Sequence, residues 1–332
     1  MKKDVILLTC QPLDDVYVWQ NHLYVESCLE QGFKEEQIHI LLWKPTYREY
    51  NIKWDVLKKH YPNINIFVYE DKGVQNYLGI YIPILRPHLL WQHFKTFPEL
   101  ETKTIIYTDC DILWTDNINI SHLLEDGINY ISDASSYMNY DYFERKNKEV
   151  IKELNGRDFL KEICDLVGVN KQIAIDNNNN TGGVQYILKN ITADFWKKIE
   201  KDVLLIRQHL LNVNSEFYEN ENKGIQSWCA DLWAIQLNLW IDREVKAAPE
   251  LSFAWACDNI DALKEKGIFH NAGITDENMS NRLNFYKGKY INGLSPFSDP
   301  IIEQILNNEE SKKYCTWYYT NKIKQLKLKY NL

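Results

Sequence analysis

The chain has 332 residues, 45% of them hydrophobic and 25% charged, which is enough for one large domain or two ordinary ones and excludes a wholly disordered chain. The formal net charge of -8 argues against non-specific nucleic-acid binding by the whole surface. Seven scattered cysteines without a C-x-x-C pair predict reduced thiols. The sequence has neither a signal-peptide pattern nor an apolar run long enough to span a membrane, so we expect a soluble cytoplasmic protein.

The N-terminal third alternates between strand and helix patterns. Gly32 is a typical stop signal for the first helix. Such alternation predicts an α/β fold of the Rossmann-like type, with a mostly parallel central sheet, flanking helices and ligands at the carboxyl ends of the strands. The patterns predict strands at 5–8, 38–42, 64–69 and 104–108, and helices at 17–31, 54–60 and 80–97.

Three further stretches have clear patterns. Residues 177–188, NNNNTGGVQYIL, predict a tight loop followed by a strand from 184 to 188. Residues 225–240, IQSWCADLWAIQLNLW, predict an aromatic-rich helix whose tryptophans mostly belong to the core. Residues 311–332 predict a short helical C-terminal tail.

Two aspartates follow the fourth predicted strand in IIYTDCDILWTD, residues 105–116. The carboxylates of Asp109 and Asp111 repel each other, and their apolar flanks reduce their hydration. A divalent cation relieves both problems, because hard cations bind carboxylate oxygens. A simple turn is the alternative, since Asp is a common turn residue. We favour the metal interpretation because the pair lies just past the end of a strand.

A third ligand candidate lies far along the chain, in GIFHNAGIT, residues 267–275. His270 follows a short apolar pair, although a histidine in such a place is often structural. Gly273 would allow the backbone to approach a phosphate closely. Two carboxylates and one imidazole suit Mn²⁺, with Mg²⁺ as the alternative.

A strand followed by D-x-D, with a distant H-x-x-G, resembles the metal-dependent glycosyltransferases of the GT-A fold, most closely those of family 8. The resemblance implies that Asp109, Asp111 and His270 bind Mn²⁺, which holds the diphosphate of a nucleotide sugar, here expected to be a UDP-sugar. It implies a GT-A domain over 1–295 and a helical, basic and aromatic C-terminal extension over 296–332.

The chain departs from the family pattern after H-x-x-G. Family-8 enzymes often have Lys-Pro-Trp there, whereas residues 275–277 are Thr-Asp-Glu. Lys287, in NFYKGKY, is the substitute that we predict for the phosphate-binding lysine.

The resemblance also implies contacts with the nucleotide. In similar enzymes the loop after the first strand contacts uracil and ribose, which suggests Thr9, Gln11 and Tyr17; an ordinary strand-to-helix loop is the alternative. Arg86 occupies a place where similar enzymes have a cation near the nucleotide or diphosphate, and a guanidinium suits phosphate geometry. A surface arginine is the alternative.

Contacts with the sugars follow from the same resemblance. The candidates near the donor sugar are Asn180, Thr181, Gly182 and Gly183, with a simple turn as the alternative. Asp231 and Asp133 are candidates for contact with sugar or acceptor hydroxyls. In an inverting enzyme Asp231 would be the base; in a retaining enzyme, which the resemblance favours, it would orient the sugar.

Two other classes of protein remain open. Phosphohydrolases of the haloacid dehalogenase type also place D-x-D after a parallel strand and bind Mg²⁺. Their motif normally lies near the N-terminus and has Thr or Val two residues after the second Asp, where this chain has Leu113. A non-catalytic sugar-binding protein is the second alternative, since lectin-like sites also combine aromatic and carboxylate side chains, but it leaves His270 unexplained.

The tail at 311–332 has six lysines and no acidic residue, with Trp317, Tyr318 and Tyr319 among them. A solvated helix is one interpretation. Peripheral docking onto an anionic membrane is the other, and it would suit a cell-surface glycan or lipid-linked saccharide as acceptor. A nucleic-acid acceptor, with modified bases, ranks second because no base-reading motif is visible. All predicted metal and nucleotide contacts precede the tail, so its removal is expected to leave donor hydrolysis nearly unchanged.

Overall fold

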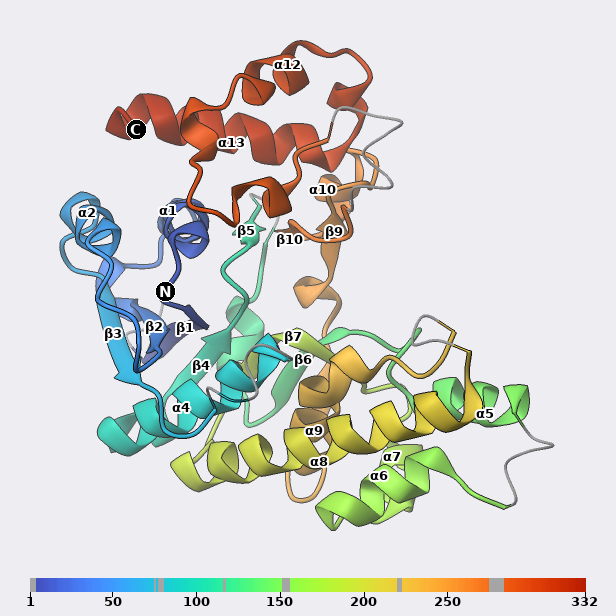
Figure 1. Ribbon diagram of the computed structural model, residues 1–332. Helices are drawn as coiled ribbons and strands as arrows, with labels where there is room; N and C mark the ends of the chain where they lie inside the picture. The colour runs from blue at the N-terminus through green and yellow to red at the C-terminus, as the bar shows by residue number, and fades with distance from the viewer. Residues whose placement is uncertain are drawn as a thin grey trace. The chain divides into compact units, whose positions relative to one another are not determined.

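The structure, a computed structural model, describes residues 4–74, 76, 81–115, 118–150, 156–219, 223–274 and 284–332 (Figure 1). The chain falls into two compact units. Unit 1 comprises Met1–Glu70, Thr108–His122 and Pro249–Leu332, and unit 2 comprises Asp71–Tyr107 and Leu123–Ala248. Both units mix helices and strands, which confirms the predicted α/β class.

Unit 1 begins with three parallel strands joined by helices. Strand β2 pairs in parallel with both β1 and β3, as predicted. Gly32 has a left-handed φ of 76°, which fits its predicted role in ending α1. All five elements lie where the sequence predicts them, within a few residues: β1 (Val5–Pro12), α1 (Asp15–Glu30), β2 (Ile38–Lys44), α2 (Lys53–His60) and β3 (Asn65–Glu70).

A second, three-stranded sheet in unit 1 has the order β5–β10–β9. Its strands are β5 (Ile112–Trp114), β9 (Phe253–Trp255) and β10 (Ile268–His270). Strand β10 runs antiparallel to β5 and parallel to β9. The apolar run after D-x-D is therefore a strand of its own, and it pairs with residues far along the chain.

The C-terminal part of unit 1 is helical, and α13 belongs to the core. It consists of α10 (Ala262–Glu265), α12 (Ile301–Asn307) and α13 (Cys315–Tyr330), the last two lying side by side (Figure 1). Tyr319 of α13 is buried and stacks on Phe269 of β10, with ring centroids 5.1 Å apart. The same hydrophobic cluster contains Trp19 of α1. Residues 296–332, expected as an extension, thus pack into the same core as the preceding residues.

Acidic side chains of unit 1 accompany most of the tail lysines. Glu26 and Glu30 lie on α1, so their ion pairs connect α13 to α1. Exposed ion pairs of this kind contribute little to stability, but they balance much of the positive charge that the sequence indicates. The pairs are Lys312–Glu309, Lys313–Glu310, Lys322–Glu30, Lys324–Glu303 and Lys329–Glu26.

Unit 2 contains strands in the order β4–β7–β6–β8. They are β4 (Thr104–Tyr107), β6 (Asn129–Asp133), β7 (Gly182–Leu188) and β8 (Val245–Ala247). Strands β6 and β8 are parallel, whereas β7 runs antiparallel to both β4 and β6. The parallel arrangement that alternation predicts is therefore interrupted at β7.

The helices of unit 2 centre on the long helix α8, which packs against α4, α6 and α9. The predicted helix at 80–97 starts only at Leu85, after a 3₁₀ turn that contains Pro83; Ile80 lies outside the described residues. The predicted helix at 225–240 likewise starts at Ala230, after a 3₁₀ turn at Ser227–Cys229. The helices are α4 (Leu85–Thr96), α5 (Tyr140–Glu149), α6 (Phe159–Val167), α7 (Lys171–Asp176), α8 (Ala193–Phe217) and α9 (Ala230–Leu239).

Among the helices in the described ranges, none combines the length and the apolar character needed to cross a bilayer. No disulfide joins any of the seven cysteines, all of which lie within the described residues.

Close packing between β6 and β7 requires a glycine at position 182. A Cβ atom on Gly182 would lie 1.6 Å from the carbonyl oxygen of Ser132, so the backbone would have to move. We expect Gly182→Ala to lower the melting temperature by about 5 °C or more. Gly127→Ala is the matched control, because a Cβ there meets nothing within 4 Å. Equal melting temperatures for the two variants, by circular dichroism, would contradict this packing argument.

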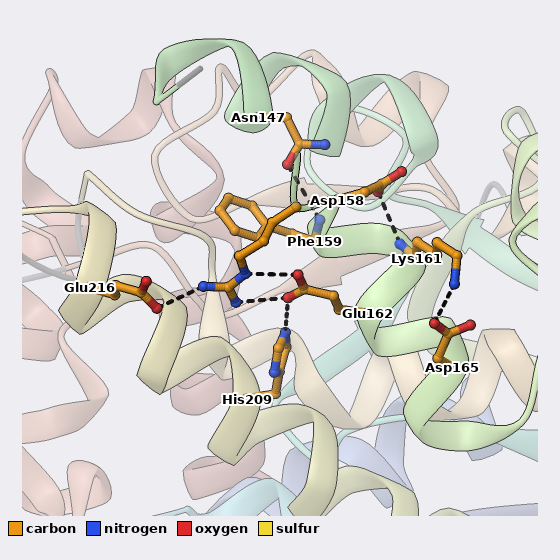
Figure 2. Close-up of polar contacts among 9 residues, drawn as sticks. Asn147, Asp158, Phe159, Lys161, Glu162, Asp165, His209 and Glu216 are labelled. Atoms are coloured by element: carbon orange, nitrogen blue, oxygen red, sulfur yellow. Dashed lines mark hydrogen bonds and ion pairs between the residues drawn. The ribbon is translucent and has the colours of Figure 1, made fainter. Parts of the chain in front are cut away.

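A charge network joins the start of α6 to α8 (Figure 2). The guanidinium of Arg157 donates to Glu162 through Nε, at 2.8 Å, and to Glu216 through Nη1, at 2.7 Å. His209 Nε2 lies 2.9 Å from the other carboxylate oxygen of Glu162. The guanidinium also packs over the ring of Phe217, 5.1 Å from its centroid.

We expect Arg157→Ala to lower the free energy of unfolding by about 1–2 kcal/mol, because the variant loses several ion pairs and the packing of the guanidinium. Lys161→Ala, which removes only an exposed pair with Asp165 on the same helix, should cost less than about 0.5 kcal/mol. Burial raises the pKa of Glu162, but Arg157 outweighs it, and the pKa lies below its ordinary value. The network's contribution is therefore present above the ordinary carboxyl pKa and lost as pH falls. Urea titrations of both variants at neutral and acidic pH measure these changes in unfolding free energy. Equal losses of stability in Arg157→Ala and Lys161→Ala would refute the contribution of the network.

Candidate functional site

The pairing of β5 with β10 brings His270 to the D-x-D pair. In this antiparallel ladder His270 lies opposite Ile112, the residue after Asp111. The backbone N–H of Asn271 donates to the carbonyl oxygen of Asp111, at 2.9 Å. One ligand atom from each of Asp109, Asp111 and His270 lies within 4.8 Å of the others. The three residues that the sequence nominates as metal ligands thus converge in unit 1.

Aromatic neighbours fix the imidazole of His270. Its ring stacks on Trp255 of β9, with a centroid distance of 5.5 Å and an angle of 17°. Phe253 packs against it edge-on, at 5.1 Å. Nε2 lies 3.3 Å from Oδ1 of Asp111, whereas Nδ1 is buried and has no hydrogen-bond partner among the described residues. The ring is therefore held in place with one nitrogen directed at a carboxylate.

Asp111 is buried and carries a full negative charge. Burial raises the pKa of its carboxyl group, but Lys287 and His270 outweigh this and hold the pKa well below its usual range. The ammonium of Lys287 forms an ion pair with Oδ2 of Asp111. Burial lowers the pKa of Lys287, but Asp111 outweighs it and the pKa is raised. Lys287, predicted as a phosphate ligand, thus lies directly beside the metal-ligand candidates.

The donor set fits a divalent cation. Two carboxylates and an imidazole match the oxygen and nitrogen ligands that Mn²⁺ accepts. A cation there would also offset the repulsion between the carboxylates of Asp109 and Asp111. The orphaned Nδ1 of His270 is a further polar atom in this region whose hydrogen-bonding capacity the described residues do not satisfy. The residues present therefore fit the group that the sequence predicts.

The residues predicted for the nucleoside lie in the same unit. Burial, and then the charges of Cys110, Asp111 and Asp109, raise the pKa of Tyr17, so its hydroxyl stays protonated. Thr9 and Gln11 are buried in β1, where Thr9 Oγ1 donates to Gln11 Oε1 at 3.1 Å. Gln11 Nε2 has no partner within the described part of the chain, so a donor atom is left over for another group.

Gly273 has a conformational reason to be glycine. Its φ is +80°, in the left-handed region, and a Cβ there would lie 3.6 Å from the ring of Trp255. Its predicted contact with phosphate stays a prediction. Residues 275–277, where the family pattern would have Lys-Pro-Trp, lie outside the described residues.

Arg86 and Asp231 are brought together in unit 2, but as partners of each other. Their side chains form a buried ion pair. The hydroxyl of Tyr81 donates to Asp231 Oδ1 at 2.9 Å, and the guanidinium of Arg86 packs over Tyr107, 5.0 Å from its ring centroid. A direct role of either residue toward the diphosphate or an acceptor would have to compete with these bonds.

The segment predicted to approach the donor sugar starts β7. Gly183 has a packing reason to be glycine, as Gly182 has, because a Cβ would lie 2.7 Å from Tyr186 Oη and 2.8 Å from Leu232. Asn180 Oδ1 accepts from the backbone of Ala247 at 3.4 Å, and Thr181 Oγ1 is buried without a partner among the residues described. Val184 has a φ of 81°, a rare conformation for a β-branched residue.

Asp133 ends β6 and is exposed. Its Oδ1 accepts from the backbone N–H of Ser135 at 2.8 Å, which holds the carboxylate in an Asx turn.

Sequence reasoning missed two neighbours of the predicted residues. Trp255 supports His270, and nothing in FAWAC marks it apart from an ordinary aromatic strand. Tyr81 holds Asp231, from which it is separated by 150 residues. Neither contact has a local sequence signal, because each depends on tertiary packing.

The predicted site residues divide between the two units. Unit 1 holds Thr9, Gln11, Tyr17, Asp109, Asp111, His270, Gly273 and Lys287, and unit 2 holds Arg86, Asp133, Asn180, Thr181, Gly182, Gly183 and Asp231.

Comparison with known proteins finds similarity to solved structures but no match at the level of sequence. No protein-family model matches the sequence, and the search of curated protein sequences gives no match. The apo structure of the bifunctional glycosyltransferase WbbM matches 98% of this chain with 11% identity and a TM-score of 0.42, and this chain spans about half, 52%, of that chain. The apo structure of mouse xyloside xylosyltransferase 1 matches 81% of this chain and 98% of its own, with 12% identity and a TM-score of 0.38. Similarities of this size establish neither a family nor an activity.

Proposed function

We propose that this chain is a metal-dependent glycosyltransferase of the GT-A type, which moves a sugar from a nucleotide-diphosphate donor to a hydroxyl acceptor. One observation carries the proposal: Asp109, Asp111 and His270, far apart in sequence, place ligand atoms within 4.8 Å of one another beside Lys287. This is the ligand set that the resemblance to family-8 enzymes implies.

The chemistry of the proposed site follows from its charges. Asp109, Asp111 and His270 would hold Mn²⁺, or Mg²⁺ as the alternative, which when bound offsets the charge that develops on the departing diphosphate. Lys287 supplies a further cation next to the same position. The protonated hydroxyl of Tyr17 can donate a hydrogen bond there. These three kinds of group would bind and orient a diphosphate.

His270 favours a transferase over a phosphohydrolase of the haloacid dehalogenase type. Mg²⁺ sites in such chemistry use oxygen ligands, whereas an imidazole suits a softer ion such as Mn²⁺. His270 is also fixed by Trp255 and directed at Asp111, an arrangement that the phosphohydrolase interpretation does not require.

A retaining mechanism is supported by the surroundings of Asp231. A general base must accept a proton from the acceptor hydroxyl, but Asp231 is buried and bound by Arg86 and Tyr81. We therefore propose a positioning role for Asp231 instead of the base role that inversion would need.

We propose a UDP-sugar as donor, because the first-strand loop and D-x-D most resemble users of such donors. We expect UDP-sugars with Mn²⁺ to raise the melting temperature in a thermal-shift panel, since a ligand that binds only the folded state stabilises it. Guanosine- and cytidine-diphosphate sugars are the controls. A response to one of those and not to a uridine donor would overturn the uridine assignment, and phosphatase activity without sugar-nucleotide binding would favour the phosphohydrolase.

A cell-surface glycan or lipid-linked saccharide is the acceptor class that we propose. Peripheral contact of residues 311–332 with an anionic membrane is part of that proposal, although acidic residues of α1 and α12 balance much of the lysine charge. Flotation of the full chain with anionic and neutral vesicles tests it, and binding that ignores lipid charge and salt would remove it. Salt-dependent retention of duplex DNA would favour a nucleic-acid acceptor instead.

A further inference from the structure

An exposed tryptophan stands out in unit 2. Trp228 has 52% of its surface exposed, although it belongs to the 3₁₀ turn that starts α9. The ring of Tyr137 lies beside it, with centroids 5.9 Å apart and the planes inclined by 30°. We call Trp228 and Tyr137 the aromatic platform: the Trp228 ring is exposed, and the half-buried Tyr137 ring supports it from one side.

The turn that carries Trp228 is held rigidly. The buried hydroxyl of Tyr81, which donates to Asp231 Oδ1 at 2.9 Å, also has its oxygen 2.8 Å from the carbonyl oxygen of Trp228. The backbone N–H of Asp231 donates back to Tyr81 Oη at 3.0 Å, and that of Gln226 donates to Tyr142 Oη, also at 3.0 Å. An exposed aromatic ring on a backbone held in this way is the kind of preorganised surface that binding sites use.

A carboxylate accompanies the platform. Asp133 and Tyr137 belong to one tight turn after β6, in which the backbone N–H of Tyr137 donates to the carbonyl oxygen of Ala134, the residue after Asp133, at 3.1 Å. Asp133 is exposed, and its Oδ1 is held by the backbone of Ser135. It lies at the carboxyl end of β6, which is parallel to β8. The carboxyl ends of parallel strands are where ligands of such sheets bind.

We propose that Trp228, Tyr137 and Asp133 form a saccharide-binding subsite, which takes one pyranose ring of the acceptor. The C–H face of a pyranose is apolar and flat, so it packs on the indole, while its hydroxyls donate to the carboxylate of Asp133. An apolar peptide would use the rings but not the fixed carboxylate. The identification of the bound saccharide as the acceptor rests on the proposed function. The subsite itself binds saccharide without donor or metal.

The test measures saccharide binding to the full chain in the absence of nucleotide. The probes are lactose, cellobiose, maltose and methyl β-D-xylopyranoside at millimolar concentrations, with ¹⁵N-labelled protein. The indole N–H signal that disappears in Trp228→Phe identifies Trp228 among the 11 tryptophans. We expect at least one probe to shift that signal in a saturable way.

Variants then locate the contact. Trp228→Ala should raise the Kd of the binding probe about tenfold or more, and Asp133→Asn should raise it several-fold. Trp91→Ala is the matched control, a half-buried tryptophan of α4 in the same unit whose ring faces Lys197; it should leave the Kd unchanged. An unshifted Trp228 signal with every probe, or an equal Kd in Trp228→Ala, would overturn the subsite.

The failure of the subsite is distinguishable from that of the proposed function. If Mn²⁺ and UDP bind but no probe shifts the Trp228 signal, the subsite alone is wrong. If a probe binds through Trp228 while Mn²⁺ and UDP do not bind, the subsite stands and the chain is a sugar-binding protein instead of a transferase.

Discussion

Asp111→Ala and His270→Ala are each expected to abolish Mn²⁺-dependent turnover of a nucleotide sugar while the fold is retained. Asp111 contributes a buried, ionised carboxylate, and His270 an imidazole fixed between Trp255 and Phe253. Loss of a metal ligand removes charge stabilisation of several kcal/mol, so we expect turnover to fall by about 1,000-fold or more. Release of UDP from a UDP-sugar measures the effect.

The control must remove an aspartate–lysine pair away from the metal ligands. Asp299 offers one, because it pairs with Lys289 at 2.7 Å in the same unit. Asp299→Ala should therefore keep nearly full turnover, even if it is slightly less stable. Circular dichroism of all three variants separates loss of the site from loss of the fold. Undiminished metal-dependent turnover in Asp111→Ala or His270→Ala would remove the proposed metal site.

Removal of residues 311–332 is expected to unfold unit 1, contrary to what the sequence suggests. Tyr319, Ile323 and Leu326 are buried in its core. Burying each of these side chains contributes about 1.5–3 kcal/mol, and the whole chain is expected to be stable by only about 5–15 kcal/mol. The truncated protein should lose cooperative melting and be cleaved rapidly by proteases. Because unit 1 holds the proposed metal ligands, Mn²⁺ binding should be lost as well.

Two milder variants separate packing from charge. Tyr319→Ala alone should cost about 3–5 kcal/mol, because it leaves a cavity beside Phe269. Lys312→Ala with Lys313→Ala removes two exposed ion pairs and should cost less than about 1 kcal/mol in total. A truncated protein that melts like the full chain and binds Mn²⁺ would show that α13 is the dispensable extension first expected.

The sequence predicts the elements of unit 1, and nominates the proposed metal ligands, for identifiable reasons. The strands and helices up to residue 70 follow the hydrophobic period, and Gly32 ends α1 as its conformation requires. Asp109, Asp111 and His270 could be nominated because D-x-D directly follows a predicted strand and, together with the distant H-x-x-G, resembles a known family pattern. The pairing that unites them, β5 with β10, joins strands of three residues each, too short to leave a pattern.

Other features depend on contacts that no local pattern encodes. The tail looks like a basic surface helix because its lysines are conspicuous, whereas its core face is formed by scattered residues such as Tyr319 and Ile323. Gly182 and Gly183 look like residues of a sugar-binding loop, but the atoms around them show that packing already requires glycine there. Arg86 and Asp231 were each predicted to face a ligand, and only tertiary structure shows that they face each other.

Binding of Mn²⁺, followed by electron paramagnetic resonance with and without UDP, tests the central claim most directly. We predict one bound Mn²⁺ per chain, bound more tightly with UDP because the diphosphate adds oxygen ligands, and lost in His270→Ala. Binding that UDP does not strengthen, or that His270→Ala leaves unchanged, would contradict the account.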